Sequence, residues 1–306
     1  MLRKFCLFCI IPLCPFSAIA QVTGSITGTV RDTSDAVIPG AKVAISNGEH
    51  GIHRETITNT SGDYLVQALG EGIYTVTISA PGFRRFIAQN TILRVGQNAR
   101  VDARLQIGSQ TADVTVQGSS AGTIETQSSE LSTTITADQI SQLELNGRSF
   151  VQLIELSPGV SNQTGQSEGV TGPGGSVSYS INGGRTEYNN WEIDGGDVLD
   201  SGSMSNLNVF PNVDALDEVQ ILTSSYDAQY GRSGSGSIEA VTKSGTNHLH
   251  GDAFEYLRNQ MFNARNYFDL PNDAIGAYKK HDFGGTIGGP IVIPHIYNGH
   301  DKSFFF

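Results

Sequence analysis

The sequence predicts a mainly β protein made of an N-terminal β-sandwich, a following α+β unit and a last group of long strands. Two observations carry this prediction. The chain has 306 residues, long enough for two domains, and it contains 36 glycines besides many Thr, Ser and Val residues. Short runs that alternate apolar and polar residues recur between turn signals, whereas long helical periodicity is rare.

The sequence of residues 1–20 predicts a secretory signal peptide. Arg3 and Lys4 precede an apolar stretch of about a dozen residues, which is too short to span a bilayer as a helix. The sequence A-I-A ends at Ala20, so we expect cleavage there and Gln21 as the mature N-terminus. The alternative is a membrane anchor. A lipoprotein is excluded because Leu13 stands before Cys14, where a small residue is needed.

Cysteine and charge exclude several classes of function. All three cysteines lie in residues 1–20, so the mature chain has no disulfide, no cysteine nucleophile and no thiolate metal site. The formal net charge is -11, and it becomes -13 when the charges of Arg3 and Lys4 are removed. No basic run remains after residue 20. We therefore expect no nucleic-acid partner.

Residues 22–107 are predicted to form the sandwich. Seven short strand-like runs follow one another at turn-punctuated spacing, as in I-Y-T-V-T-I-S, where Tyr74, Val76 and Ile78 share one face. Between Thr60 and Phe83 the motifs T-S-G-D-Y, G-I-Y-T-V and P-G-F resemble those of the carboxypeptidase regulatory-like domain. That resemblance implies a prealbumin-like sandwich of the carbohydrate-binding-like fold group. Glu71 stands where members often have proline, so the turn departs slightly from the pattern. A binding or docking module and a stabilising spacer both remain open.

Residues 110–244 are predicted to form the α+β unit. Thr136 followed by Gln139 is a capping-box signal for a helix start, and Asn146-Gly147 is the expected end. A second helix is expected in R-S-F-V-Q-L-I-E-L, because its apolar residues recur at helical spacing before Pro158-Gly159.

The same residues carry the most specific resemblance in the chain. L-N-G-R-S-F, S-P-G-V, I-N-G-G-R, I-D-G, Y-D-A-Q-Y-G-R and A-V-T-K-S-G-T-N are similar to the plug of a TonB-dependent outer-membrane receptor. The regulatory-like domain in front of them is typical of the Oar-like branch. The plug-motif residues are Asn146, Gly147, Arg148, Asn182, Gly183, Arg185, Asp194, Gly195, Tyr230, Gly231 and Arg232.

Two groups of charged residues in this unit leave alternatives open. Arg185 and Arg232 are candidates for charge pairs with acidic groups of a barrel lumen, or else they are solvated surface arginines. Asp194, Asp197 and Asp200 supply the oxygens that a calcium ion requires, but their spacing matches no known calcium loop. Turn and cap aspartates are the favoured interpretation.

The resemblance also implies a contact segment for TonB. In the family a short extended TonB box lies just before the plug and pairs with TonB as an added strand. Ala112, Asp113, Val114, Thr115 and Val116 occupy that place.

Residues 245–306 are expected to be the first two strands and the start of a third strand of a transmembrane β-barrel. A plugged receptor barrel has about 22 strands. At roughly 9–11 residues each, it needs on the order of 220 strand residues. Only 63 residues follow Lys243 (306 minus 243). We therefore expect an N-terminal fragment that lacks most of the barrel and transports nothing alone. A terminal aromatic that acts as an assembly signal is the rival interpretation.

The resemblance implies an outer-membrane transporter energised by TonB, with the sandwich and the plug on the periplasmic side. Its substrate stays open, with a glycan and a peptide as candidates. The alternative is a secreted or periplasmic carbohydrate-binding module. No H-E-x-x-H, G-x-S-x-G or Walker A motif occurs, so we expect no enzyme, and no cofactor is implied. His248 and His250 form an H-x-H that lacks an evident third metal ligand.

Overall fold

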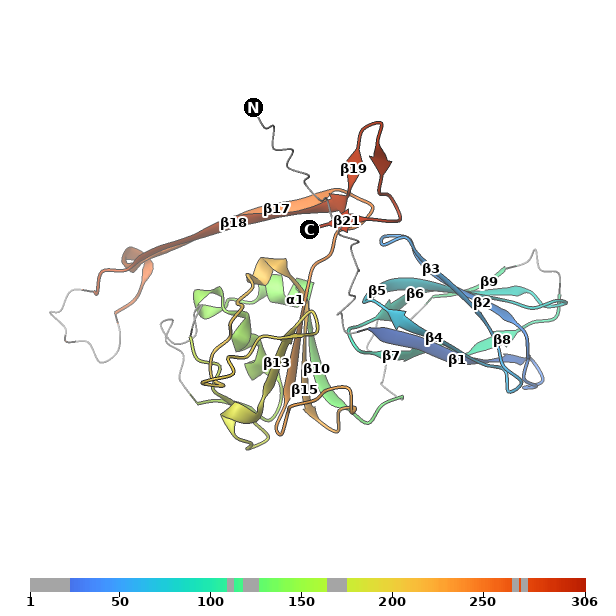
Figure 1. Cartoon of the computed structure of the whole chain (residues 1–306), viewed down its shortest axis with the longest axis horizontal. Coiled ribbons are helices and arrows are strands. Elements are labelled where there is room, and N and C mark those ends of the chain that lie inside the picture. Colours follow the sequence, from blue (N-terminus) through green and yellow to red (C-terminus); the bar gives the residue numbers. More distant parts are fainter. Residues whose placement is uncertain (1–22, 109–112, 118–126, 164–174, 266–269, 271–274) are drawn as a thin grey trace, which may run out of the picture.

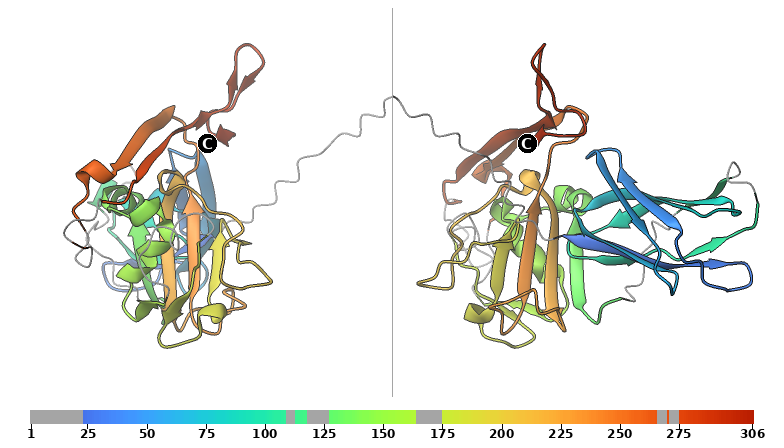
Figure 2. Two further views of the ribbon diagram at one scale, coloured as in Figure 1. Left: turned by 90° about the vertical axis from the view of Figure 1, so that its left-hand side faces the viewer. Right: turned by 45° about the vertical axis from the view of Figure 1, so that its right-hand side comes forward.

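The computed structural model describes residues 23–108, 113–117, 127–163, 175–265, 270 and 275–306. The expected signal peptide with Ala20 and Gln21, and also Ala112, lie outside these residues. Figure 1 shows three parts: a sandwich (strands β1 to β9), a central unit (β10 to β16) beside it, and a C-terminal sheet that crosses one end of the central unit. The two views in Figure 2 show the same arrangement.

The sandwich consists of two sheets. Apolar and polar residues alternate along their strands, and the apolar side chains point between the sheets. One sheet contains β1 (Gly24–Asp32), β4 (Asp63–Leu69), β7 (Asn98–Arg100) and β8 (Ala103–Leu105). The other has the order β3-β2-β5-β6-β9, formed by Ile52–Ile57, Lys42–Asn47, Gly72–Ser79, Arg85–Leu93 and Asp113–Gln117. Val43, Ile45, Tyr74, Val76 and Ile78 are fully buried between the sheets. The predicted sandwich is therefore confirmed, with more strands than the seven expected.

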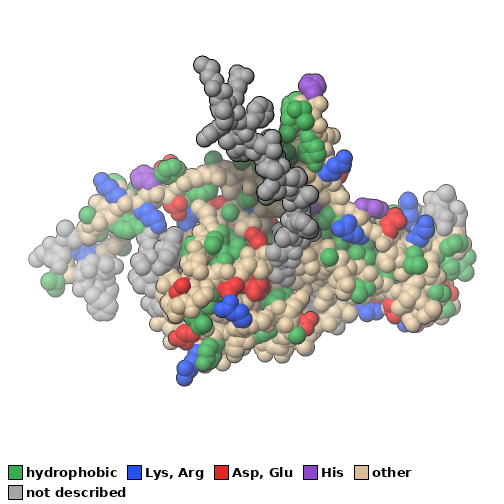
Figure 3. Space-filling model, in the orientation of Figure 1, with side chains coloured by type: hydrophobic (Ala, Val, Ile, Leu, Met, Phe, Trp, Pro, Cys, Tyr) green, Lys and Arg blue, Asp and Glu red, His purple; other side chains and the backbone are tan. Residues whose placement is uncertain are grey.

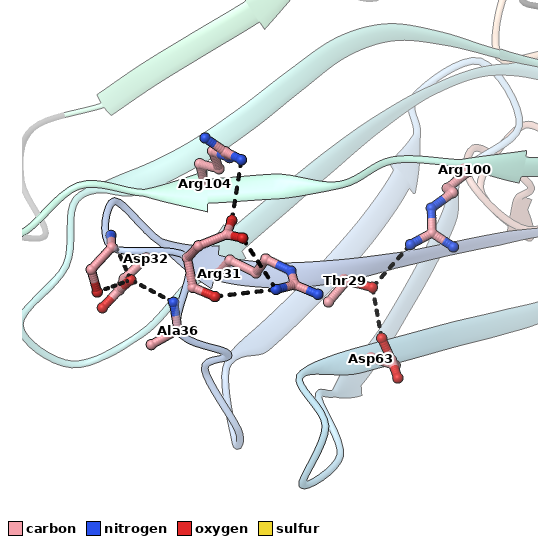
Figure 4. A network of polar contacts seen from close by, with 9 residues as sticks. Thr29, Arg31, Asp32, Ala36, Asp63, Arg100 and Arg104 are labelled. Atoms are coloured by element: carbon pink, nitrogen blue, oxygen red, sulfur yellow. Dashed lines mark hydrogen bonds and ion pairs between the residues drawn. The ribbon is translucent and has the colours of Figure 1, made fainter.

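Polar contacts tie together the strands of the first sheet (Figure 4). Asp63, in the S-G-D motif, accepts a hydrogen bond of 2.7 Å from the Thr29 hydroxyl, which itself accepts one of 3.0 Å from Arg100. Arg104 donates to Asp35 at 3.1 Å, so β8 is joined to the turn after β1. The motif aspartate thus organises the sheet from its place at the start of β4.

The central unit is an α+β domain with its own core. Its sheet has the order β10-β15-β16-β13-β14, formed by Leu131–Thr136, Leu216–Ser224, Ser237–Thr242, Asn190–Ile193 and Gly196–Asp197. A short pair is formed by β11 (Val160–Asn162) and β12 (Tyr179–Ile181). The helical segments are α1 (Ala137–Gln142) and four 3₁₀ turns: η1 (Asn146–Arg148), η2 (Phe150–Leu156), η3 (Thr186–Tyr188) and η4 (Val213–Ala215). Phe150 and Trp191 meet edge to face in the core at 6.4 Å between ring centroids.

The two expected helices form, but both differ from the prediction. The Thr136 backbone N–H donates to Gln139 Oε1 at 3.1 Å, as the capping box predicts. However, α1 ends at Gln142, earlier than the expected end at Asn146-Gly147, and the second segment is a 3₁₀ helix. Tertiary packing decides both outcomes, because segments this short have little helical stability of their own.

The C-terminal sheet has the order β17-β18-β21, formed by His250–Asn259, Lys279–Pro290 and Phe304–Phe305. The turn η5 (Gln260–Phe262) follows β17, and the small hairpin β19–β20 (Val292–Ile293 and Tyr297–Asn298) projects from the molecule. Exposed apolar side chains cover this projection (Figure 3), among them Ile296, which is 81% exposed. Two long strands and the beginning of a third are thus present, as the sequence predicts.

The segment at residues 113–117 lies on the sandwich. We expected the second unit to begin at residue 110, but β9 pairs in parallel with β6 from Arg85↔Asp113 to Gln89↔Gln117. Along the described part of the chain, no helix is both long and apolar enough to span a membrane.

Candidate functional site

Arg148 is the side chain that joins the central unit to the C-terminal sheet. Its guanidinium forms an ion pair with Asp214 of the central unit and lies 3.6 Å from the carboxylate of Asp282 in β18. It also lies over the Tyr256 ring, 3.7 Å from the centroid, with Phe254 at 5.2 Å. The side chain is 17% exposed. One cation therefore contacts acids and aromatic faces from two parts of the protein.

The rest of the N-G-R motif supports this contact. Asn146 Oδ1 accepts a hydrogen bond of 2.8 Å from Arg258 in β17. Gly147 is buried with φ 67°, a left-handed conformation that costs glycine little. A cavity of about 490 Å³ lies between this motif and the strands, lined on one side by Ile140 and Leu143.

The C-terminal sheet turns one face to the central unit. Tyr256 is directly opposite Asp282 in the β17–β18 ladder, and both approach Arg148. Side chains of neighbouring positions point to opposite faces of a sheet. The face away from the central unit therefore includes Leu257, Phe283 and Ile287, which are 48%, 75% and 60% exposed.

The I-N-G-G and S-P-G-V motifs meet at a turn. The Asn182 backbone N–H donates to the Gly159 carbonyl at 2.8 Å, and its amide Nδ2 donates to the Thr223 carbonyl at 2.9 Å. Asn182 and Gly183 both have positive φ values, 52° and 76°. These motif residues have a structural role as a tight turn.

The I-D-G motif forms a β-hairpin whose loop has two residues. Ile193 pairs with Gly196, and between them Asp194 and Gly195 have φ values of 51° and 75°, as a type I′ turn requires. The Asp194 carboxylate accepts hydrogen bonds from the Thr242 backbone N–H at 2.9 Å and hydroxyl at 2.8 Å.

The three aspartates considered for calcium have separate partners. Asp194 is bound to Thr242, Asp197 forms an ion pair with Arg232 and accepts from the Leu199 N–H, and Asp200 accepts from the Ser203 N–H at 2.7 Å. Hydrogen bonds from Ser203 lower the pKa of Asp200 below its usual value. These contacts match the turn and cap interpretation.

The two candidate lumen arginines contact residues of their own unit. Arg232 pairs with Asp197, and Arg185 lies over the Tyr188 ring at 6.0 Å. Tyr230 is 6% exposed and packs edge-on against Tyr226. Gly231 has open space beside it, because a Cβ atom added there would meet no atom within 4 Å. These contacts stay within the central unit, whereas Arg148 contacts an acidic residue of β18.

The H-x-H pair takes part in local packing. His250 stacks with Phe306 at 6.3 Å, and its Nδ1 lies 2.9 Å from the His248 carbonyl. Among the residues that the structure describes, no three acidic, histidine or cysteine side chains gather as a metal site would require.

A row of polar side chains, of which Gln220 and Glu239 are buried, crosses the sheet of the central unit. Gln220, Glu239 and Glu192 are direct neighbours in β15, β16 and β13. Glu239 is 1% exposed and accepts a hydrogen bond of 2.8 Å from Ser237. Burial raises the pKa of Glu239 to about 7, against the opposing effect of that hydrogen bond. Our sequence analysis missed this row. Its one signal is the polar pair Ser237 and Glu239, two positions apart in the strand S-I-E-A-V-T.

The sandwich also contacts the segment that leads into β17. Asn247 donates from its backbone N–H to the Glu49 carbonyl at 2.8 Å and from Nδ2 to the Gly48 carbonyl at 2.9 Å. The same amide donates to the Asp301 carboxylate at 2.6 Å. At a second place the backbone of Val95 lies near the buried carboxylate of Glu218 in β15 and acts to lower the pKa of that carboxyl group. Among the described residues, the sandwich thus contacts both the central unit and the segment that leads into β17.

The aromatic side chains of the sandwich offer no exposed platform for a sugar. Tyr64, Tyr74 and Phe86 are 3%, 0% and 7% exposed, and Phe83 packs against the same core. The Tyr64 and Tyr74 hydroxyls donate to the Val101 and Gly70 carbonyls. These rings belong to the core of the sandwich.

Comparison with family models accounts for all three parts. Residues 25–106 match the carboxypeptidase regulatory-like domain, residues 124–238 the TonB-dependent receptor plug domain, and residues 241–306 an outer membrane beta barrel domain. The chain therefore carries the plug domain of TonB-dependent receptors, followed by part of an outer membrane beta barrel domain. The central unit is its plug, and the C-terminal sheet belongs to its barrel domain. Arg148 therefore joins the plug of a TonB-dependent receptor to strands of the barrel domain.

A curated relative supports this assignment. The chain is 27% identical, over 305 aligned residues, to the TonB-dependent transporter Oar of Myxococcus xanthus. The alignment covers 95% of this chain and 27% of the relative, so the chain spans about a quarter of the length of that receptor.

Solved structures resemble only part of the chain. The TIE protein of Bacillus anthracis is 20% identical, with a TM-score of 0.26, over 28% of this chain and 17% of its own. Catechol 1,2-dioxygenase of Acinetobacter radioresistens is 16% identical, with a TM-score of 0.23, over 30% of this chain and 54% of its own.

Proposed function

We propose that this chain is the front part of an outer-membrane transporter in which TonB acts on the plug to open a lumen for substrate. The contact of Arg148 with Asp282, Tyr256 and Phe254 carries the proposal. It holds the plug against one face of the first barrel strands, the relation that a gate inside a lumen requires. The opposite face bears Leu257, Phe283 and Ile287, which suit contact with lipid.

The sandwich and the TonB-contacting segment lie on the periplasmic side in this proposal. Outer-membrane barrels have short periplasmic turns and longer extracellular loops. The connection between β17 and β18 spans residues 260–278 and is longer than that between β18 and β21, which spans 291–303. The sandwich contacts Asn247, which binds Asp301 in the shorter connection. This supports a periplasmic position for the sandwich.

TonB is the proposed partner, and the segment from Ala112 to Val116 is the proposed TonB box. The described part, Asp113 to Val116, is an extended edge strand directly before the plug match at residue 124. Edge strands present unpaired backbone groups to which another strand can add. The transported substrate stays open, with a glycan and a peptide as candidates.

Cell fractionation tests the location. An antibody against residues 22–107 should detect the native receptor in the outer-membrane fraction, and the signal should resist extraction by high salt. Recovery of the signal in the soluble periplasm would contradict the transporter and favour the secreted binding module.

A further inference from the structure

The proposed TonB box is already part of a folded sheet. Its strand β9 pairs with β6 along five consecutive residues, and in the described structure no strand pairs with the opposite edge of β9. The residue pairs run from Arg85↔Asp113 to Gln89↔Gln117. A segment that has to recruit TonB is thus extended before TonB arrives, and its outer edge is open among the described elements.

The two outer strands of this sheet differ in character. The strand at the far edge, β3, carries His53, Arg54 and Glu55 in succession, with a contact of 3.2 Å between His53 and Glu55. Charged side chains of this kind protect an edge against added strands. The sequence of β9 is D-V-T-V-Q, in which β-branched residues favour strand pairing and only the first residue is charged. Of the two edges, β9 is the one suited to accept a strand.

The chain around β9 is fixed to the sandwich and leads to the plug. Just before it, the Gly108 N–H donates to the Gly82 carbonyl at 3.0 Å and the Arg84 N–H donates to the Gln106 carbonyl at 2.8 Å. These bonds place the end of β8 beside the start of β6. After β9 the plug match begins at residue 124, so force applied to β9 reaches the plug through a short connection.

We propose that the sandwich is the platform for TonB: β9 stays paired with β6 while a strand of TonB adds to its outer edge. This inference rests on the proposed function, because it takes residues 112–116 as the TonB box. In this proposal the regulatory-like domain is more than a spacer, because it holds the TonB box in an extended conformation. A strand that is extended in advance loses less conformational entropy when its partner binds. The rival mechanism is release, in which β9 has to leave β6 before TonB can bind.

Deletion of the sandwich distinguishes the two mechanisms, because they predict opposite changes in the affinity for TonB. The full-length receptor in detergent and the purified periplasmic domain of TonB from the same organism are the two binding partners. We expect deletion of residues 25–106 to raise the dissociation constant about tenfold, because β9 loses its template. A lower dissociation constant would show that the sandwich holds β9 back, and an unchanged one would show a spacer. Either result would overturn the proposal.

A disulfide between β6 and β9 provides a second test that keeps the domain folded. Ile87 and Thr115 are direct partners in the ladder, and the chain has no cysteine after residue 20. In the oxidised Ile87→Cys/Thr115→Cys receptor we expect TonB to bind within about twofold of the reduced form. A tenfold loss that reduction reverses would establish release and overturn the platform.

A matched control uses the same position in β6. Thr77 of β5 is the other direct partner of Ile87, so Thr77→Cys/Ile87→Cys places an equivalent disulfide away from β9. It should leave the affinity unchanged in both redox states. Deletion of residues 112–116 tests the underlying assignment separately: if TonB still binds that variant normally, the TonB box has been misplaced, whatever the platform variants show.

Discussion

At the residue scale, Arg148 shows why an arginine stands in the L-N-G-R motif. Its planar guanidinium can lie flat on the Tyr256 ring while its edges face Asp214 and Asp282. A lysine could neutralise one acid but could not stack in this way. The residue was recognised from the sequence as part of a motif. Its partners were not, because they lie more than sixty residues away.

We predict that Arg148→Ala loosens the junction of plug and barrel strands. Loss of a half-buried ion pair with two acids should lower the local opening free energy by about 2 kcal/mol. This corresponds to amide hydrogen exchange about thirtyfold faster in residues 143–150 and in β17. Arg185→Ala is the control, since Arg185 is exposed and contacts only Tyr188 among the described contacts. Equal exchange rates in the two variants would contradict the role of Arg148.

Two buried carboxyl groups of the central unit, those of Glu218 and Glu239, predict a pH dependence of stability. Burial raises the pKa of both Glu218 and Glu239 to about 7 from an ordinary value of 4.5. The folded chain therefore holds these protons between pH 4.5 and 7, where the unfolded chain has released them. The free energy of unfolding should fall as the pH rises through this window and level off above it.

We predict that Glu239→Gln reduces this pH dependence and stabilises the chain at pH 8, because the amide needs no proton to remain neutral. Urea denaturation at several pH values measures the effect. Glu187→Gln provides the control, since Glu187 is exposed. An unchanged slope in Glu239→Gln would mean that this carboxyl group is not the source.

At the scale of elements, alternation and turn chemistry account for what could be predicted. I-Y-T-V-T-I-S became a strand with Tyr74, Val76 and Ile78 fully buried, because one face of a sandwich sheet must be apolar. The I-D-G motif became a hairpin turn because Asp194 and Gly195 tolerate positive φ.

Other elements depend on contacts that local sequence does not contain. The residues 113–117 alternate like any short strand, and nothing in them indicates which sheet they join. Their parallel pairing with β6 requires β7 and β8 as the crossover, a relation set by the whole sandwich. The segment from Phe150 to Leu156 has helical spacing but forms 3₁₀ turns, since the core around Trp191 fixes its shape.

We expect that the sandwich does not bind sugars. Its tyrosines are buried and their hydroxyls donate to backbone carbonyls, so no ring is available for stacking on a pyranose. We predict flat titrations of residues 22–107 against a varied glycan panel by calorimetry. Saturable binding to any glycan would contradict this prediction and favour the carbohydrate-binding alternative. The Tyr64→Phe variant would then show whether this tyrosine hydroxyl contributes to glycan binding.

At the scale of the molecule, contacts of Asn247 and Arg148 join the three parts. Asn247 binds the sandwich turn at Gly48 and Glu49 and also Asp301, while Arg148 joins the plug to β17 and β18. The sandwich is therefore attached to the junction of plug and barrel, and Figure 1 shows it beside the plug with the C-terminal sheet across the end. In this arrangement a pull on β9 acts on a domain that is also attached to the segment between the plug and the barrel strands.

Crosslinking to TonB in intact cells tests the central claim most directly. Formaldehyde is applied to cells that carry either the full-length receptor or a variant lacking residues 112–116, and TonB is then assayed in the receptor recovered from the outer membrane. We predict that TonB crosslinks to the intact receptor and not to the variant, although both reach the outer membrane in equal amounts. Equal crosslinking of both, or none with either, would contradict TonB-driven gating through this segment.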